Sequence, residues 1–255
     1  MTDKKKTPRR GIGENHNIVA GRNAVSAALE SGRSIERLIV ADGTGGSVKK
    51  IVAAAKERKI KIEYRERSYL DRLYDGAHQG VVAVVSAHQY STVGEILEFA
   101  YKREESPFIV ILDSIEDPHN LGAVMRTAEC AGAHGVIIGK NNAVGLTQTV
   151  AKASAGAIEY MRVAKVTNLA RTIDELKDKG VWIAACDMDG DDYTGADLKG
   201  SIAIVIGNEG KGISRLVKDK CDFTVSIPMK GRISSLNASN AAAILMYEIV
   251  RQRCE

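Results

Sequence analysis

The chain has 255 residues, of which 44% are hydrophobic and 27% are charged, with a net charge of +4. These values are ordinary for a globular protein of one large or two modest domains that folds on its own. No apolar run approaches the roughly 20 residues of a membrane-spanning helix, and no apolar segment follows the charged start MTDKKKTPRR to form a secretory signal. We therefore expect a cytoplasmic protein.

The cysteines give no sign of a metal site or of disulfide bonds. Cys130, Cys186, Cys221 and Cys254 lie far apart, without C-x-x-C spacing or paired histidines. The run DMDGDD at 187–192 imitates the start of a calcium loop but lacks its glycine and its closing glutamate. We predict no bound metal and four reduced, mostly buried thiols.

Charge is unevenly distributed along the chain. Residues 1–90 hold 17 Lys and Arg against 10 Asp and Glu, whereas residues 91–255 hold 19 against 22. A basic first part beside a slightly acidic remainder indicates one part for holding a polyanion and another for a different task. From charge alone, a solvated surface without a partner is an equal alternative.

The first part of the chain is typical of a basic arm followed by a small α/β domain. We expect a flexible arm over residues 1–13 and a compact domain over residues 14–87. The expected elements of this domain are helices over 21–32 and 48–59 and strands over 37–42, 61–66 and 79–87. Residues 88–105 are expected to form a linker and a first helix from about Val93 to Arg103.

Strands and helices alternate strictly over residues 106–255. Strands are expected over 108–113, 135–139, 160–166, 181–187, 201–207 and 223–228, and helices over 120–132, 146–156, 168–180, 213–220 and 237–253. This alternation predicts a mostly parallel sheet covered on both faces. Because ligands of such sheets bind at the carboxyl ends of strands, the informative loops follow Asp113, Ile206 and Pro228.

The loop after Ile206 looks at first like a phosphate-binding loop. In IVIGNEGKGIS, however, no lysine and hydroxyl pair directly follows Gly212, and Arg215 breaks the G-x-G-x-x-G pattern at its last position. The sequence instead predicts a strand–loop–helix turn with Asn208 and Glu209 at its tip. Such a turn can offer backbone amides and one carboxylate to a ligand without phosphate.

The loop after Asp113 leads into a helix that carries an unexpected arginine. Asn120 or His119 is expected to cap this helix, and Arg126 follows six residues after Asn120, inside an otherwise small and apolar helix. An arginine in such a place either extends to solvent or awaits an anion.

The loop after Pro228 is rich in hydrogen-bond donors. Ser234, Ser235 and Asn237 precede the last helix, although one of them is enough to cap it. The alanines at 238, 241, 242 and 243 form a narrow side that suits either a subunit contact or an ordinary core helix.

Taken together and in this order, DPHNLGAVMRTAECAG, IVIGNEGKGIS and IPMKGRISSLNASNAAAI resemble the three signature motifs of the SpoU-type RNA 2′-O-ribose methyltransferases of the SPOUT superfamily. The first domain, with GRNAV and the HQG turn, resembles the ribosomal-protein-like substrate-binding domain of one subgroup. That subgroup methylates a guanosine of bacterial 23S ribosomal RNA.

The resemblance implies an α/β SPOUT fold whose parallel sheet ends in a deep C-terminal trefoil knot. It also implies S-adenosylmethionine as the methyl donor, ribosomal RNA as the substrate, and a homodimer formed through the knotted domain. No metal is required by the implied chemistry. A transfer-RNA ribose methyltransferase, a base methyltransferase of the same superfamily and a non-catalytic ribosome-associated RNA-binding protein are the alternatives.

The resemblance also assigns residues. The implied cofactor-binding residues are Ile206, Gly207, Asn208, Ile227 and Leu236. The implied catalytic set is Arg126, as proton acceptor or as an electrostatic group, with Asn120, Glu209, Ser235 and Asn237 positioning the ribose and the loops. The basic residues expected to contact the RNA backbone are Arg22 and, in the arm, Lys4, Lys5, Lys6, Arg9 and Arg10.

Overall fold

The computed structural model describes residues 17–30, 33–86 and 88–254. Within these residues the chain forms two compact units, the first ending at Gln89 and the second beginning at Tyr90. The predicted basic arm, with Lys4, Lys5, Lys6, Arg9 and Arg10, lies outside the described residues. No helix in the described part is long and apolar enough to cross a lipid bilayer.

The first unit is a small α/β domain. Its elements are β1 (Ile18–Ala20), α1 (Arg22–Glu30), β2 (Ile35–Ala41), α2 (Val48–Glu57), β3 (Lys61–Arg65), α3 (Arg67–Leu73) and β4 (Val81–Val85). The strands form one sheet in the order β1-β4-β2-β3, in which only β2 and β3 run parallel. Helices α1 and α2 cover one face of this sheet, and Leu70 of α3 packs on the other with Ile39 and Val82.

Two elements of the first unit were not predicted from the sequence. Strand β1 is only three residues long and pairs with β4, so its pattern is too short to be recognised. Helix α3 lies in the charged run RERSYLDRL, where only Leu70 is buried. A single buried side chain gives no helical period to read.

The second unit contains α4 (Val93–Lys102), β5 (Phe108–Leu112), α5 (Pro118–Cys130), β6 (Gly135–Gly139), α6 (Gln148–Ala153), β7 (Val163–Val166), α7 (Leu169–Lys177), β8 (Trp182–Asp192), β9 (Ile202–Ile206), α8 (Arg215–Lys218), β10 (Phe223–Ser226) and α9 (Ala238–Arg253). Short 3₁₀ turns lie at Ala157–Glu159 and Tyr193–Gly195.

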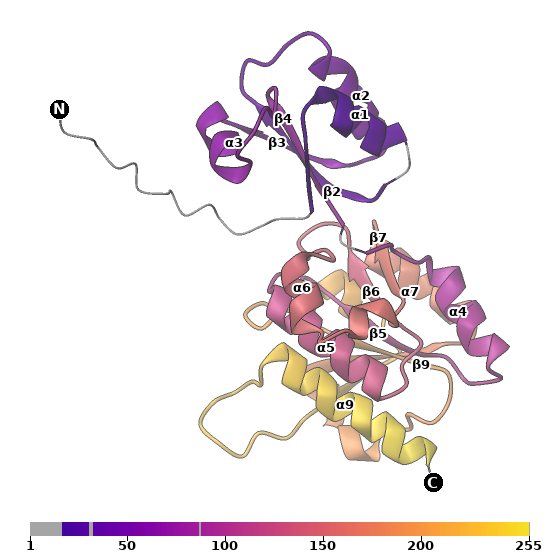
Figure 1. The fold of residues 1–255 in the computed structure, drawn as a ribbon. Helices are drawn as coiled ribbons and strands as arrows, with labels where there is room; N and C mark the ends of the chain where they lie inside the picture. The colour runs from indigo at the N-terminus through magenta and orange to yellow at the C-terminus, as the bar shows by residue number, and fades with distance from the viewer. Residues whose placement is uncertain (1–16, 31–32, 87, 255) are drawn as a thin grey trace. The chain divides into compact units, whose positions relative to one another are not determined.

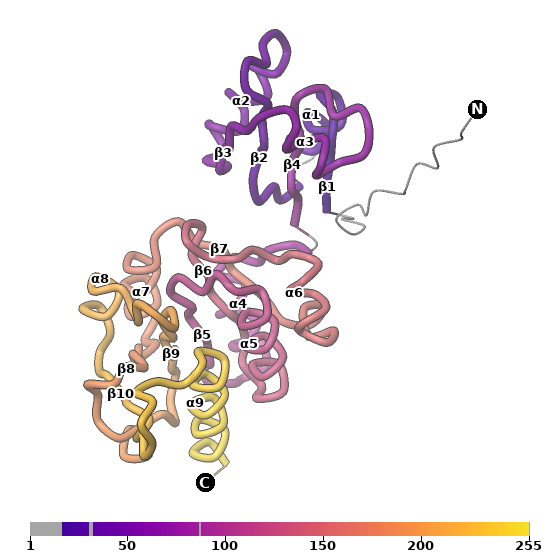
Figure 2. Tube along the Cα trace, turned by 90° about the vertical axis from the view of Figure 1, so that its left-hand side faces the viewer, coloured from indigo at the N-terminus to yellow at the C-terminus, as the bar shows by residue number. Residues whose placement is uncertain are grey.

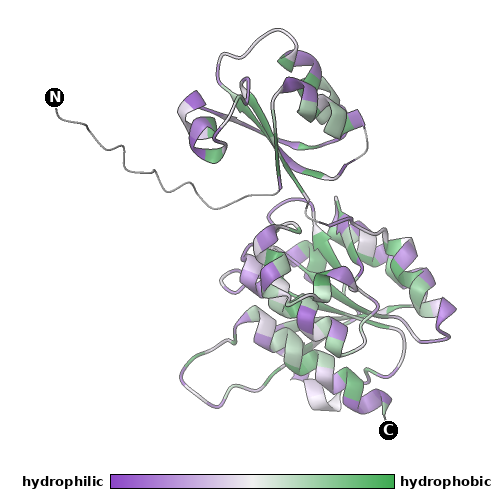
Figure 3. Ribbon diagram, in the orientation of Figure 1, coloured by the Kyte–Doolittle hydropathy of each residue, from purple (hydrophilic) through white to green (hydrophobic). Residues whose placement is uncertain are grey.

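The sheet of the second unit has the order β10-β8-β9-β5-β6-β7, and every pairing is parallel. Successive residues of β5 face opposite sides, because side chains alternate along a strand. Phe108 and Val110 pack with α5 and α9, whereas Ile109 and Ile111 pack with α4 and α7. Helices therefore cover both faces, as predicted, and the apolar strands lie between them (Figures 1 and 3).

Helix α4, expected from the sequence in a segment between the two domains, belongs to the second unit. Ile96 is fully buried and Leu97 nearly so, and both pack with β5 and α7. Thr92 and Glu95 close its first turn in a capping box. The expected boundary at residue 106 is thus too late, since the compact unit starts before this helix.

Strand β8 is interrupted by a bulge. Its partner β10 pairs Thr224 with Ala185, but the next residue, Val225, pairs with Asp191. Residues 186–190 therefore have no partner in β10, although Cys186 still pairs with Ile206 of β9 at the carboxyl end of the sheet. The sequence indicated only a regular strand ending at 187.

The last helix begins as predicted but packs differently from one expectation. Asn237 caps α9 by accepting a hydrogen bond from the backbone N–H of Ser239 at 2.9 Å. Ala238 and Ala242 are buried in their own unit, where α9 lies beside α5 (Figures 1 and 2). These two alanines cannot form the subunit contact suggested for them, because the chain's own core covers them.

The cysteine prediction was wrong for two positions. Cys130 and Cys254 are exposed, because each lies at the end of a surface helix, while Cys186 and Cys221 are partly buried.

Candidate functional site

Three loops meet at the carboxyl ends of strands in the second unit. They follow β5 and β9, which are neighbours, and β10, which β8 separates from β9; the sequence predicted these three loops. The side chain of Asp113 accepts a hydrogen bond from the backbone N–H of Ser214 at 2.7 Å, and Asn208 Nδ2 donates to the carbonyl of Ser114 at 3.0 Å. The loops after β5 and β9 are thus fastened to each other at two points.

The loop after β9 is folded back on itself and has no room for a side chain at its start. Asn208 and Gly212 exchange both backbone hydrogen bonds, at 3.0 and 2.8 Å. A Cβ atom on Gly207 would lie 2.2 Å from the carbonyl carbon of Gly212 and 2.3 Å from the nitrogen of Ile213. Backbone atoms cannot yield as the end of a flexible side chain can, so this position requires glycine.

One carboxylate joins all three loops. Glu209 Oε1 accepts hydrogen bonds from Asn120 Nδ2 at 2.9 Å, from Asn237 Nδ2 and from the backbone N–H of Ala238 at 3.4 Å. Asn237 Nδ2 also donates to Asn120 Oδ1 at 2.9 Å. We call Asn120, Glu209 and Asn237 the Glu209 cluster.

Asn120 does not cap its helix, contrary to the expectation from the sequence. Asp117 is the N-cap of α5 and accepts from the backbone N–H of His119 at 2.9 Å. Asn120 is buried in the first turn, and its whole amide is used in the Glu209 cluster. Asp117 thus caps the helix, and Asn120 connects the loops.

A pocket of about 380 Å³ lies against these loops; we call it the loop pocket. This volume is within the range of ordinary ligand sites, which is roughly 300–1,000 Å³. Its wall includes all five residues predicted to bind a cofactor, Ile206, Gly207, Asn208, Ile227 and Leu236. Ser235 and Glu209 of the predicted catalytic set also line it.

Cys186, Asp187 and Met188, in the β8 bulge, complete the wall of the loop pocket, and the sequence analysis missed them. Their position at the carboxyl end of a strand next to β9 could have indicated that they line the site. Lys218 of α8 holds the bulge through Asp187 at 3.0 Å and Asp189 at 2.6 Å. The hydrogen bond to Asp189 is the largest cause of the raised pKa of Lys218.

The Cys186 thiol is kept uncharged by its surroundings. Burial, together with the negative charge of Asp187, raises the pKa of Cys186 to about 11. At neutral pH the side chain is therefore a weakly polar thiol on the pocket wall.

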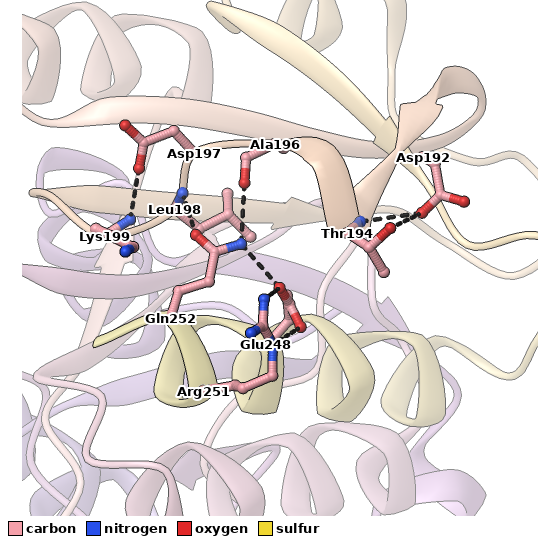
Figure 4. Close-up of polar contacts among 9 residues, drawn as sticks. All are labelled: Asp192, Thr194, Ala196, Asp197, Leu198, Lys199, Glu248, Arg251 and Gln252. Atoms are coloured by element: carbon pink, nitrogen blue, oxygen red, sulfur yellow. Dashed lines mark hydrogen bonds and ion pairs between the residues drawn. The ribbon is translucent and has the colours of Figure 1, made fainter. Parts of the chain in front are cut away.

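A larger hollow of about 700 Å³ lies elsewhere in the second unit. Trp182, Ile202 and Phe223 on its wall are the first residues of β8, β9 and β10, so it reaches the amino ends of these strands. Gln252 of α9 ties down the loop beside it, donating to the carbonyl of Ala196 and accepting from the N–H of Leu198 (Figure 4). Because ligands of parallel sheets bind at the carboxyl ends, the smaller loop pocket is the better candidate site.

The structure does not bring every predicted residue together. Arg126 is exposed on α5 and, among the described residues, makes no hydrogen bond or ion pair. Arg22 lies in the first unit, at the start of α1. In the described part of the chain, no group of three or more His, Cys, Asp or Glu side chains is placed to hold a metal ion.

Sequence comparison identifies both units. Residues 18–91 match the family described as RNA 2′-O ribose methyltransferase substrate binding, and residues 107–247 match the SpoU rRNA Methylase family. The chain belongs to the SpoU methylase family. A TrmH family tRNA/rRNA methyltransferase of Bacillus subtilis, YacO, is 48% identical over 244 residues, which cover 95% of this chain and 98% of that protein.

Solved structures of SpoU methylases share the fold. The enzyme AviRb of Streptomyces viridochromogenes, in complex with S-adenosylmethionine, is 27% identical, with a TM-score of 0.59 over 93% of this chain and 90% of that one. An rRNA methyltransferase of Sinorhizobium meliloti, also with S-adenosylmethionine bound, is 25% identical, with a TM-score of 0.57 over 92% of this chain and 86% of that one.

A shorter relative matches less of the chain. The TrmH/SpoU tRNA-modifying enzyme of A. aeolicus is 27% identical, with a TM-score of 0.53 over 62% of this chain and 84% of that one. This SpoU methylase is accordingly an S-adenosylmethionine-dependent RNA methyltransferase with a substrate-binding unit before its methylase unit.

The loop pocket suits that cofactor. The close approach of backbone at Gly207 leaves amide and carbonyl groups, not side chains, to meet an adenosine. Ile206, Ile227 and Leu236 offer the apolar surface that a purine ring needs. These residues would hold S-adenosylmethionine, which supplies an electrophilic methyl group when bound.

We predict that Gly207→Ala abolishes S-adenosylmethionine binding and lowers the free energy of unfolding by about 1–3 kcal/mol, because its Cβ would overlap backbone atoms. Isothermal titration calorimetry and thermal unfolding measure the two effects. Gly210→Ala is the matched control in the same loop, since its Cβ would meet only Asn208 Oδ1 at an ordinary 3.5 Å. Equal cofactor affinity in the two variants would contradict this account of the loop.

Proposed function

We propose that this SpoU methylase transfers a methyl group to the ribose 2′-oxygen of a guanosine in 23S ribosomal RNA, and that it acts as a cytoplasmic enzyme. The observation that carries the proposal is the pairing of a substrate-binding unit at 18–91 with a methylase unit at 107–247. The rRNA methyltransferase of S. meliloti matches 92% of the chain, whereas the tRNA-modifying enzyme of A. aeolicus matches 62%. The choice of guanosine follows from the resemblance of the first unit, with GRNAV and the HQG turn, to one subgroup of the family.

The proposed reaction needs a group that stabilises negative charge. The ribose 2′-oxygen gains the methyl group as the carbon–sulfur bond breaks, the sulfur leaves as a neutral thioether, and the hydroxyl proton passes to solvent as the new bond forms. A 2′-hydroxyl is a very weak acid, so the site must accept the proton or stabilise the developing alkoxide. The reacting oxygen must also be held in line with the methyl group, because small displacements slow such reactions strongly.

Arg126 is the candidate for that charge stabilisation. Among the described residues no carboxylate neutralises its guanidinium. It is therefore available to an anionic partner, either an RNA phosphate or the developing alkoxide. An electrostatic role needs no proton on or off the arginine.

The Glu209 cluster would position the ribose and the loops. The hydrogen bonds that Glu209 accepts from the described residues end on its Oε1, which leaves Oε2 to accept a hydrogen bond from a hydroxyl of the target ribose. Ser235, on the wall of the loop pocket, would add a hydroxyl donor beside the same loops. Asn120 and Asn237 hold the carboxylate from two sides, so its position is fixed before RNA binds.

We also propose that the loops of the second unit form the deep trefoil knot implied by the family resemblance. The folding back of the chain after β9 and its fastening to the loop after β5 support this threading. An experimental chain trace that straightens completely when its two ends are drawn apart would contradict it.

The test of the reaction is methyl transfer from labelled S-adenosylmethionine to unmodified 23S ribosomal RNA, followed by mapping with alkaline hydrolysis. A 2′-O-methyl group blocks cleavage at its own nucleotide, so we expect one protected guanosine. Label without protection would indicate a base methyltransferase. Label on transfer RNA alone would indicate a transfer-RNA methyltransferase, and cofactor binding without transfer to either RNA would indicate a non-catalytic RNA-binding protein. Each of these three results would contradict the proposal.

We predict that Arg126→Ala lowers the rate of methyl transfer by about 100- to 1,000-fold, because charge stabilisation is lost at the reacting oxygen. Cofactor affinity and thermal stability should stay unchanged, since Arg126 is exposed and does not line the loop pocket. Arg126→Lys tests the electrostatic role and should keep part of the rate. Arg171→Ala, at an exposed position of α7, is the control; near-normal turnover of Arg126→Ala would refute the assignment.

A homodimer through α9 is a further part of the proposal. Asn240, Ala243 and Tyr247 lie on one side of this helix, away from the buried Ala242 and Leu245, and Tyr247 is 52% exposed. We expect twice the chain mass of 27.4 kDa in light scattering, and a shift toward monomer in Tyr247→Glu. Tyr101→Glu on α4, where the tyrosine is 51% exposed, is the control. A monomeric wild-type protein at micromolar concentration would exclude this arrangement.

A further inference from the structure

The first unit contains a polar hollow of about 650 Å³, separate from the loop pocket. We call it the arginine hollow. Its wall comes from the start of α1, the loop after β2, the start of α3 and the turn before β4. The lining residues are Arg22, Ala41, Asp42, Gly43, Thr44, Gly45, Arg67 and Gln79.

Arg22 is held in place by neutral groups. Its Nε donates to the carbonyl of Gln79 at 3.3 Å, and Nη1 donates to the hydroxyl of Ser47 at 3.2 Å. Its backbone N–H donates to Oε1 of Gln79 at 3.1 Å. A guanidinium oriented by a carbonyl and a hydroxyl keeps its full charge, and it is pre-organised for an anion.

The turn that supplies Gln79 is itself fixed by a buried histidine. His78 is 2% exposed; its Nδ1 accepts from the backbone N–H of Gly80 at 3.1 Å, and its Nε2 donates to Asp71 at 2.9 Å. Gln79 adopts a φ of 52°, which few residues other than glycine take up. The motifs GRN and HQG, far apart in the sequence, thus build one support for the Arg22 guanidinium.

The arginine hollow has an excess of positive charge. Arg67 is exposed on its wall, and among the described residues neither Arg22 nor Arg67 pairs with a carboxylate. Of the described residues that line this wall, Asp42 alone is acidic. A carboxylate repels a free phosphate but accepts a hydrogen bond from a ribose hydroxyl or from a base N–H.

We propose that the arginine hollow binds the RNA backbone, with Arg22 and Arg67 on a phosphodiester and Asp42 on a hydroxyl or base donor of the same nucleotide. The combination of two cations with one acceptor favours a nucleotide within a strand over inorganic phosphate. A 2′-hydroxyl is also the group by which a protein distinguishes RNA from DNA. This inference rests on the proposed function for its substrate and adds the contact that holds it.

The test is filter binding of unmodified 23S ribosomal RNA to the full-length protein over a series of KCl concentrations. The variants are Arg22→Ala, Arg67→Ala and the double variant, with Arg72→Ala as the control. Arg72 is exposed near the end of the same helix as Arg67 but does not line the arginine hollow. We expect at least a tenfold loss of affinity in the double variant. The slope of the logarithm of the binding constant against the logarithm of the KCl concentration should become shallower by roughly 0.7–0.9 for each phosphate contact removed.

Several results would overturn the inference. An RNA affinity and salt dependence in the double variant equal to those of the wild type would do so. An equal loss of RNA affinity in Arg72→Ala would also do so, because it would indicate that RNA binds to the general positive charge of the surface. Inorganic phosphate that displaces the RNA at millimolar concentration from the wild type but not from the double variant would indicate a free-phosphate site. If an alanine variant fails to fold, RNA binding is measured with Arg22→Lys and Arg67→Lys, which keep the charge but lose the planar guanidinium.

The binding assay separates this inference from the proposed reaction. Wild-type protein that binds 23S ribosomal RNA through the arginine hollow but methylates no ribose would refute the reaction alone. Methylation of one guanosine with an unchanged KM in the double variant would refute the arginine hollow alone.

Discussion

The arrangement of the second unit depends on one carboxylate. Glu209 receives hydrogen bonds from Asn120, from Asn237 and from the start of α9, so three segments that are far apart in the sequence meet at one oxygen. Charge-assisted hydrogen bonds of this kind are stronger than neutral ones. The loop pocket exists because these segments are held at fixed distances, and its backbone groups can face a ligand without rearrangement.

This constraint also explains why different residues cap the helices and connect the loops. Asp117 starts α5, which frees Asn120, while Asn237 both starts α9 and joins the Glu209 cluster. Asn237 can do both because its amide nitrogen and oxygen point to different partners. Gly207 and Asn208 then shape the chain between these contacts, the first by having no side chain and the second by accepting from Gly210 and Lys211.

Much of this site could be predicted from the sequence, because the carboxyl ends of parallel strands meet at one edge and each informative loop follows a short apolar strand. Ile227 and Leu236 were recognised only through the resemblance to a family. Asp187 and Met188 were missed because a bulge changes the register between β8 and β10, and register depends on tertiary pairing. The cap at Asp117 was missed because aspartate and asparagine are both good capping residues, and Asn120 lies only three residues further on. The place of Arg126 relative to substrate is decided by the RNA, so the chain alone does not fix it.

Cys186 sets a chemical limit on what the loop pocket can tolerate. A thiolate is a strong nucleophile toward alkyl sulfonium compounds, and the family cofactor is such a compound. Because its pKa is raised to about 11, the Cys186 side chain is a thiol and not a thiolate at neutral pH. Burial beside Asp187 thus keeps this thiol uncharged on the wall of the pocket that we propose for the cofactor, where its sulfur atom offers soft, polarisable contact surface.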